Sequence, residues 1–172
     1  MAEPLLIDER QGLGLAAVMA RKGVGAAAIG AAIGLAPLAE AGRTARADLA
    51  LISTGPGVWL AVVEDVGGDW PAALEGQLDG LCAVSDQSGA YGVFRISGPG
   101  ARDLLQRGVA IDLHPDAFAP GSAAATVIAH IGVILWRPGQ DETFEVAVFR
   151  SYVPSFRHWI DVNVAIVAPP AP

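Results

Sequence analysis

Three histidines are the side chains of this chain best suited to binding a metal. His114, His130 and His158 are far apart in the sequence, and none has a neighbouring cysteine or a pair of carboxylates at ligand spacing. A protein zinc site needs three or four converging nitrogen, sulfur or oxygen ligands. The sequence therefore predicts no metal site.

Two candidate nucleophiles lie close together, at Cys82 and Ser85. A serine hydrolase needs a base within hydrogen-bond reach and an oxyanion hole, usually at a strained turn, and no such turn is visible in Ser85-Asp86-Gln87-Ser88. Asp86 is better explained as a strand-end cap or an ion-pair partner. Cys82 lies in the apolar run LCAV, which favours a buried and inert thiol. We assign no catalytic residue.

Two glycine-proline-glycine sequences could be taken for phosphate loops. Gly98-Pro99-Gly100 lies at an expected strand-to-helix junction, where free backbone N–H groups can bind an anion. It lacks both the GxGxxG spacing and a following Lys-Ser/Thr pair. A tight structural turn is the better interpretation there and at Gly55-Pro56-Gly57, so no cofactor-binding residue is predicted.

Charge and cysteine content exclude several classes of protein. The net charge is −7 and the sequence pI is near 4.8, with Lys22 as the only lysine and no basic run. Nucleic acid binding requires clustered cations that release counterions, so it is not expected. A single cysteine allows no disulfide within the chain, which indicates a reducing compartment and favours the cytoplasm.

The apolar content is high for a soluble monomer of 172 residues. Hydrophobic residues make up 52% of the chain and the mean hydropathy is +0.44, so we expect a partner to cover part of the surface. Residues 23–39 are uncharged and follow Arg21-Lys22, as in a membrane signal. This segment is shorter than the roughly 20 residues that span a bilayer, and it is rich in Ala and Gly. We expect a buried helix and no membrane contact.

The expected elements alternate in a way that is typical of an α+β fold. The first half has strands at 13–19, 49–54 and 58–63, helices at 24–35 and 69–80, and a loop at 39–47. The second half has paired strands at 84–88 and 91–97, a helix at 101–107, strands at 124–130, 132–137 and 143–149, a helix at 153–159 and a frayed tail from 167. The order resembles a split βαβ unit that is repeated. We therefore predict two interlocked ferredoxin-like halves, 1–80 and 81–172, in one compact unit.

Four tryptophans are candidate interface anchors, because aromatic residues and arginine are enriched at protein interfaces. Trp59 and Trp136 lie inside expected strands, where core packing explains them better. Trp159 lies among charged residues near the end of the chain. We take Trp159 with Phe156, Arg157 and Arg150 as a candidate subunit interface.

Several irregular segments occur in a characteristic order. The first is STGPGVWL, and the second begins at Leu81 and reads LCAVSDQSGAYGVFRISGPGARDLLQRGVAIDLHPDAFAPG. They are followed by TVIAHIGVILWRPG, FEVAVFRS and SFRHWI. Together they resemble the gamma subunit of heterotetrameric sarcosine oxidase, a small relative of the folate-binding aminomethyltransferase (T-protein) fold. The resemblance implies a complex with alpha, beta and delta subunits that oxidises sarcosine to glycine. It places FAD, FMN, NAD and tetrahydrofolate in the large subunits, zinc in the delta subunit and no cofactor in this chain.

One departure from the aminomethyltransferases matters for function. In those enzymes a Gly-Gly-hydrophobic-hydrophobic-Asp-Asp phrase opens the strand that delivers the catalytic carboxylate. The equivalent strand here is His130 to Arg137, which has no acidic residue. The resemblance therefore implies a non-catalytic, structural subunit. The alternatives are a stand-alone tetrahydrofolate-binding aminomethyltransferase-like protein and the same subunit in an oxidase for another N-methyl or secondary amine.

Overall fold

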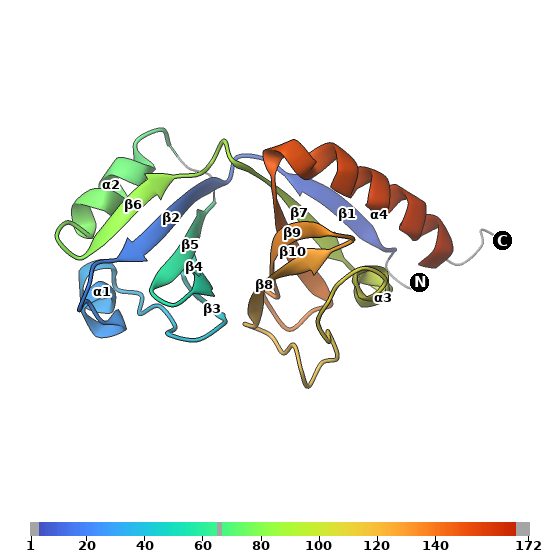
Figure 1. Cartoon of the computed structure of the whole chain (residues 1–172), viewed down its shortest axis with the longest axis horizontal. Coiled ribbons are helices and arrows are strands. Elements are labelled where there is room, and N and C mark those ends of the chain that lie inside the picture. Colours follow the sequence, from blue (N-terminus) through green and yellow to red (C-terminus); the bar gives the residue numbers. More distant parts are fainter. Residues whose placement is uncertain (1–3, 65–66, 168–172) are drawn as a thin grey trace. The chain divides into compact units, whose positions relative to one another are not determined.

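The computed structural model describes residues 4–64 and 67–167 and divides them into two compact units (Figure 1). We call Gln11–Tyr91 the central unit, because in the sequence it lies between the two segments that form the other unit. The terminal unit combines the described residues up to Arg10 with those from Gly92 onward. Each unit contains one five-stranded sheet.

The central unit is a ferredoxin-like sheet with one extra edge strand. Its elements are β2 (Gly14–Ala20), α1 (Ala26–Ile33), β3 (Arg43–Arg46), β4 (Leu49–Gly55), β5 (Val58–Val63), α2 (Trp70–Gln77) and β6 (Cys82–Asp86). The strand order is β3-β4-β5-β2-β6, and all neighbours are antiparallel. Strand β5 thus lies between β2 and β4, and β2 lies between β5 and β6. This insertion of one strand between two others defines the split βαβ arrangement.

The terminal unit repeats this arrangement with strands from both ends of the chain. Its elements are β1 (Leu6–Arg10), β7 (Tyr91–Ser97), α3 (Ala101–Gln106), β8 (Ala123–Ile128), β9 (Ile131–Trp136), β10 (Thr143–Phe149), the 3-10 turn η1 (Arg150–Tyr152) and α4 (Val153–Val167). The strand order is β1-β7-β10-β9-β8. The place that β6 fills in the central unit is filled here by β1, which pairs antiparallel with β7. The N-terminal strand therefore completes a sheet otherwise built from the second half of the chain.

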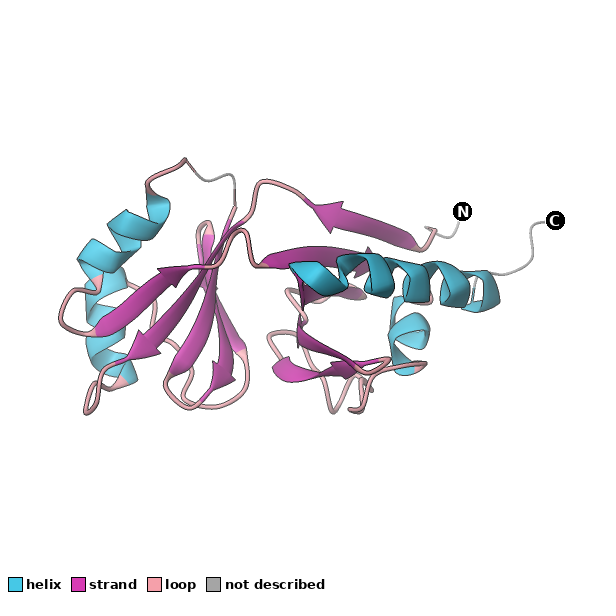
Figure 2. Ribbon diagram, turned by 45° about the horizontal axis from the view of Figure 1, so that its top comes forward, coloured by secondary structure: helices cyan, strands magenta, loops and turns pink. Residues whose placement is uncertain are grey.

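Helices cover one face of each sheet (Figure 2). In the terminal unit, Leu104 and Leu105 of α3 and Phe156 and Ile160 of α4 pack with the inward-facing residues of β7, β9 and β10. In the central unit, Ile29 of α1 joins residues of α2 and the sheet in a smaller core. The sheets and cores of the two units confirm the predicted fold, which is an α+β fold of two ferredoxin-like halves.

The structure places the unit boundary differently from the expected division after residue 80. Residues 82–86 form β6, which pairs with β2 of the central unit, and β7 pairs with β1. The expected pairing of 84–88 with 91–97 is therefore wrong. The polar sequence Leu6–Arg10 is strand β1, and residues 43–46 of the expected loop form the edge strand β3.

The apolar helix α1 is shorter and more exposed than the sequence predicts. It spans Ala26–Ile33 and buries only Ile29 completely. It ends at Gly34, whose φ of 69° is a left-handed conformation that glycine adopts without strain. Within the described ranges, no helix combines the length and the apolar character needed to cross a bilayer. Helix α4 continues to Val167, beyond the expected end at 159. The first residue of the tail expected from 167 is thus helical, and residues 168–172 lie outside the described residues.

Candidate functional site

The most deeply buried charged cluster joins three neighbouring strands of the terminal unit. Glu145 on β10 is only 4% exposed. Its Oε1 accepts hydrogen bonds from Arg10 Nη1 on β1, at 2.8 Å, and from Arg95 Nε on β7, at 2.7 Å. Arg95 Nη2 donates to the same oxygen. One carboxylate thus holds together the three strands β1, β7 and β10.

This cluster is built for structure and not for proton transfer. Along β10 the side chains alternate, so Phe144 and Val146 enter the helix-covered core while Glu145 faces the opposite side of the sheet. A general base must be free to accept a proton from a substrate, whereas Oε1 of Glu145 already accepts from two guanidinium groups. The sequence analysis missed this cluster. A glutamate within the apolar strand TFEVAVF was the available signal.

The strand expected at 132–137 is β9. Strand β9 spans Ile131–Trp136 and contains no acidic residue. The nearest buried carboxylate is that of Glu145, which is paired in register with Trp136. A carboxylate therefore lies beside this strand, but it is engaged by arginine.

The candidate nucleophiles lie in the central unit. Cys82 is 3% exposed, and burial raises the pKa of its thiol, an effect that Arg21 partly offsets. Asp86 accepts hydrogen bonds from the backbone N–H of Ser88, at 2.8 Å, and from the Ser88 hydroxyl, at 2.7 Å. These two bonds lower the pKa of Asp86. The Ser88 hydroxyl also accepts the Leu15 N–H, at 3.0 Å, so the motif ties the end of β6 to the start of β2.

The three histidines do not converge. His130 lies in the turn between β8 and β9, His158 lies on α4, and His114 lies in the loop after α3; all three are exposed. The described residues hold no group of three or more His, Cys, Asp or Glu side chains that could bind a metal ion.

The two glycine-proline-glycine sequences are turns. Gly55-Pro56-Gly57 connects β4 and β5, with Gly57 at a φ of 68°. Gly98 and Gly100 have φ values of 89° and 88° and lead into α3, which has only six residues. Asp141 and Glu142 line the pocket beside Gly98 and would repel a phosphate group.

The structure separates the four residues of the candidate interface. Phe156 is fully buried and stacks edge-to-face on Phe94 at a centroid distance of 5.2 Å, so it offers no surface to a partner. Trp159 is half-buried against the same core. Arg157 is exposed; it pairs with Glu9 of β1 and lies over the Phe94 ring. Arg150 is exposed in η1, beside Phe149 and Tyr152, which are each 49% exposed.

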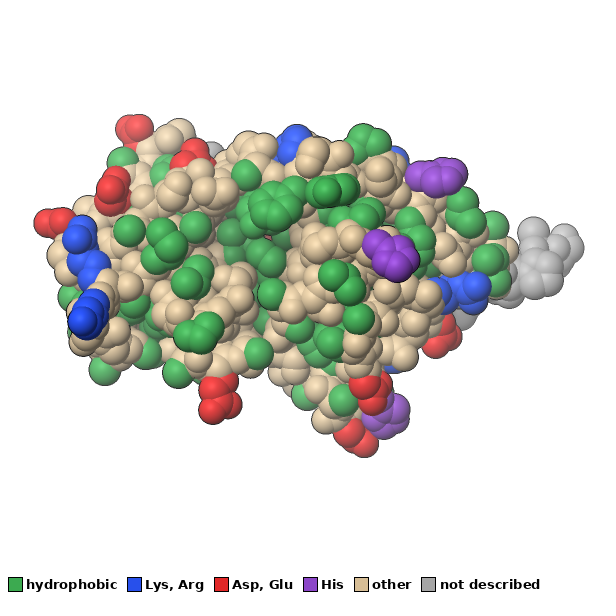
Figure 3. Space-filling model, in the orientation of Figure 1, with side chains coloured by type: hydrophobic (Ala, Val, Ile, Leu, Met, Phe, Trp, Pro, Cys, Tyr) green, Lys and Arg blue, Asp and Glu red, His purple; other side chains and the backbone are tan. Residues whose placement is uncertain are grey.

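Basic side chains are few on the face drawn in Figure 3. Some adjoin one another at its left edge, and the others lie apart among uncharged side chains.

The doubled ferredoxin-like fold is similar to that of the folate-binding aminomethyltransferases. The crystal structure of the glycine cleavage system aminomethyltransferase T from Bartonella henselae has a TM-score of 0.66 at 17% identity, covering 91% of this chain and 46% of that one. This likeness shows the fold alone.

The chain belongs to the sarcosine oxidase gamma subunit family, whose model matches residues 18–166. It is 36% identical over 104 residues to the sarcosine oxidase subunit gamma of Arthrobacter sp., which is 59% of this chain and 49% of that protein. The corresponding subunit of Corynebacterium sp. strain P-1 is 35% identical over 77 residues, covering 45% of this chain and 37% of that one. The chain thus spans about half the length, or less, of the curated relatives it matches.

A solved structure covers more of the chain. A chain of the heterotetrameric sarcosine oxidase from Corynebacterium sp. U-96 matches with a TM-score of 0.84 at 27% identity, covering 98% of this chain and 88% of that one. The resemblance to the gamma subunit that the sequence indicated is confirmed.

Proposed function

We propose that this chain is the structural gamma subunit of a heterotetrameric oxidase that converts sarcosine to glycine. The observation that carries the proposal is the match to a heterotetrameric sarcosine oxidase over 98% of the chain. The hydrogen bonds from Arg10 and Arg95 to Glu145 support a structural role. Glu145 is the buried carboxylate nearest to β9, the counterpart of the strand that carries the catalytic carboxylate in the aminomethyltransferases, and the two arginines bind it.

The proposed partners are the alpha, beta and delta subunits, which hold FAD, FMN, NAD, tetrahydrofolate and zinc in this proposal. Cys82 is the only cysteine, so no disulfide forms within the chain, and we place the complex in the cytoplasm. The part of the chain in contact with partners includes Arg150 and the half-buried Trp159.

Co-expression tests this proposal. The three partner chains should yield a stable complex that oxidises sarcosine only when they are co-expressed with this chain. The purified chain alone should show no turnover. Assembly of a fully active complex without this chain would contradict a bracing role. Replacing sarcosine with other N-methyl or secondary amines in the same assay separates the proposed substrate from the alternatives.

The fold likeness to aminomethyltransferase T makes tetrahydrofolate binding the second function to test. Calorimetric titration of the purified chain with tetrahydrofolate should give no heat of binding. Micromolar binding by this chain alone would instead favour a folate-binding protein that acts independently.

A further inference from the structure

Strand β8 is the only edge strand without a charge in the described part of the chain. The edge strands are β1 and β8 in the terminal unit and β3 and β6 in the central unit. Three of them contain charged residues, in LIDER of β1, RTAR of β3 and CAVSD of β6, whereas β8 reads AAATVI. Edge strands commonly carry charges, prolines or bulges, which prevent another strand from pairing with them. Strand β8 has none of these three features.

The outer backbone groups of β8 are covered at one end of the strand and open in its middle. The C=O of Val127 accepts a hydrogen bond from the N–H of Ala110 at 3.2 Å, so it points away from β9. Because successive residues of a strand alternate in direction, Ala125 also points its N–H and C=O away from β9. Ala125 is exposed, and neither group has a hydrogen-bond partner among the described residues. A position for one more strand is therefore open beside Ala125.

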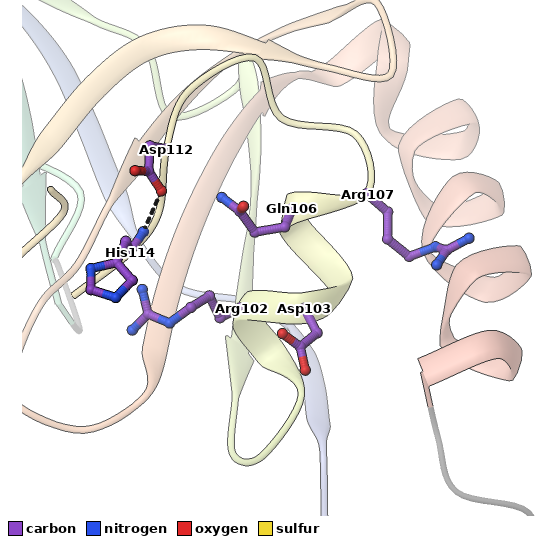
Figure 4. Close-up of a pocket in the computed structure, with 6 residues that line it drawn as sticks. All are labelled: Arg102, Asp103, Gln106, Arg107, Asp112 and His114. Carbon is purple, nitrogen blue, oxygen red and sulfur yellow. Dashed lines mark hydrogen bonds between the residues drawn. The ribbon is translucent and has the colours of Figure 1, made fainter. Parts of the chain in front are cut away.

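The segment that follows α3 does not fill this position. Ala110 is its last residue that makes a backbone hydrogen bond to β8. The chain then folds on itself, since the His114 N–H donates to Asp112 Oδ1 at 2.8 Å (Figure 4), and Leu113 is buried in the helix-covered core. The residues from 111 to 122 thus leave the middle of the β8 edge uncovered.

Exposed apolar residues lie beside this edge, on the sheet face that the helices leave free. Val127 is 43% exposed and pairs in register with Gly132 of β9, where an added Cβ would meet nothing within 4 Å. Phe149 is 49% exposed; it follows Val148, which pairs with Val133, and so lies beside Gly132 on the next strand. Val133 and Val148 face the helix-covered core, so Gly132 and Phe149 face the other side. A strand added at β8 would extend this apolar row, because cross-strand neighbours share a face.

We propose that an extended segment of another subunit pairs with β8 and bonds to the backbone of Ala125. An extended backbone is required because a helix already satisfies its own N–H and C=O groups, whereas an added strand offers free ones. Apolar side chains on this segment are favoured because they would cover Val127 and Phe149. The partner segment is therefore a short apolar strand. This inference rests on the proposed function, which supplies the other subunits.

Hydrogen exchange of single backbone amides, compared between the isolated chain and the co-expressed complex, tests this pairing. The Ala125 amide should exchange about tenfold or more slowly in the complex, because the added strand would accept its hydrogen bond. The Ala45 amide of the edge strand β3 is the control and should not change. It also points outward, since the C=O of Gly42, three residues earlier, accepts the Ser53 N–H next to β4. A complex that slows both amides equally, or does not slow the Ala125 amide, overturns the proposal.

The exchange measurement also identifies the occupant. Slow exchange at Ala125 that appears in the isolated chain as its concentration rises would mean that a second copy of this chain pairs with β8, and the proposal would be wrong. Failure of the wild-type chain to form any complex would contradict the proposed function and this inference with it. Fast exchange at Ala125 within a complex that does form would contradict this inference alone.

Assembly of proline variants provides the second test. Ala125→Pro removes the outward N–H and places a ring where the added strand would lie, while the hydrogen bonds from β8 to β9 remain. It should weaken assembly with the partner chains about tenfold or more. Ala45→Pro makes the same change on β3 and should alter assembly less than about twofold. Equal weakening by both variants, or none by Ala125→Pro, would contradict the pairing, and the wild-type exchange measurement decides the question if Ala125→Pro does not fold.

Discussion

The side chains of Glu145 and Arg95 meet across two neighbouring strands of the terminal unit, with Oε1 and Nε 2.7 Å apart. Arg10 approaches the same oxygen from β1, so a residue near the N-terminus is bound to a residue 135 positions later. This contact fastens β1, the strand that is contributed from the far end of the chain, to the sheet that it completes.

Removing the charge of Glu145 should destabilise the terminal unit strongly. Glu145→Gln removes the buried charge that both guanidinium groups bind, and breaking a buried ion pair in this way costs about 3 kcal/mol or more. Glu142→Gln is the control, because Glu142 is 39% exposed and its ion pair with Arg102 is longer, so its loss should cost less than about 1 kcal/mol. Urea unfolding of the two variants measures the difference, and equal free energies of unfolding would show that the cluster is not a structural clamp.

Two glycine substitutions should change stability in opposite directions. A Cβ at Gly108 would lie 2.7 Å from the Trp159 ring and 3.2 Å from the Ala129 backbone nitrogen, so Gly108→Ala should cost about 1–3 kcal/mol through overpacking. A Cβ at Gly76 on α2 would meet nothing within 4 Å. Gly76→Ala should therefore stabilise the chain by about 0.5–1 kcal/mol. Thermal unfolding checks both signs, and a neutral Gly108→Ala would mean that the Trp159 ring is not held against Gly108.

The pKa of Asp86 should depend on Ser88. Because the Ser88 N–H and hydroxyl lower this pKa in the folded chain, Asp86 contributes stability above its unfolded pKa, and that contribution is lost as the pH falls through the folded pKa. Ser88→Ala should raise the pKa of Asp86 only part of the way, since the backbone N–H remains. Carbon-detected NMR titration of the carboxyl group measures the shift. Ser85→Ala, which removes a hydroxyl that is bonded to Gln87 and not to Asp86, should leave the pKa unchanged.

Replacing the two residues of the turn between β8 and β9 should make the chain more stable. Ala129 and His130 have φ values of 48° and 68°, and they connect the paired residues Ile128 and Ile131. Two-residue hairpin turns with two positive φ values favour Asn-Gly, so the double variant Ala129→Asn with His130→Gly should gain about 1 kcal/mol. Ala125→Gly, in the exposed middle of β8, should instead lose about 0.5–1 kcal/mol. A melting temperature that falls in the turn variant would contradict the assigned geometry.

Local features of the sequence determined most of the element types. The hairpin around Gly55-Pro56-Gly57 and the helix that begins after Asp69 lie where the sequence predicts them, although the Asp69 side chain makes no capping hydrogen bond. Cys82 is buried as its apolar neighbours indicated. The phrases from Leu81 to Trp159 were specific enough to indicate the family. These signals act over a few residues, so they can be read without knowing which strands pair.

Pairing between distant segments was decided only by the tertiary structure. The sequence Leu6–Arg10 has too many charges to predict a strand by itself, and it becomes β1 because β7 offers a partner edge and Glu145 accepts Arg10. Likewise β6 and β7 are neighbours in sequence but pair with β2 and β1, which lie elsewhere in the chain. Hydrogen bonds and buried charges between strands depend on residues far apart in sequence, and hydrophobic periodicity carries no information about which of them will meet.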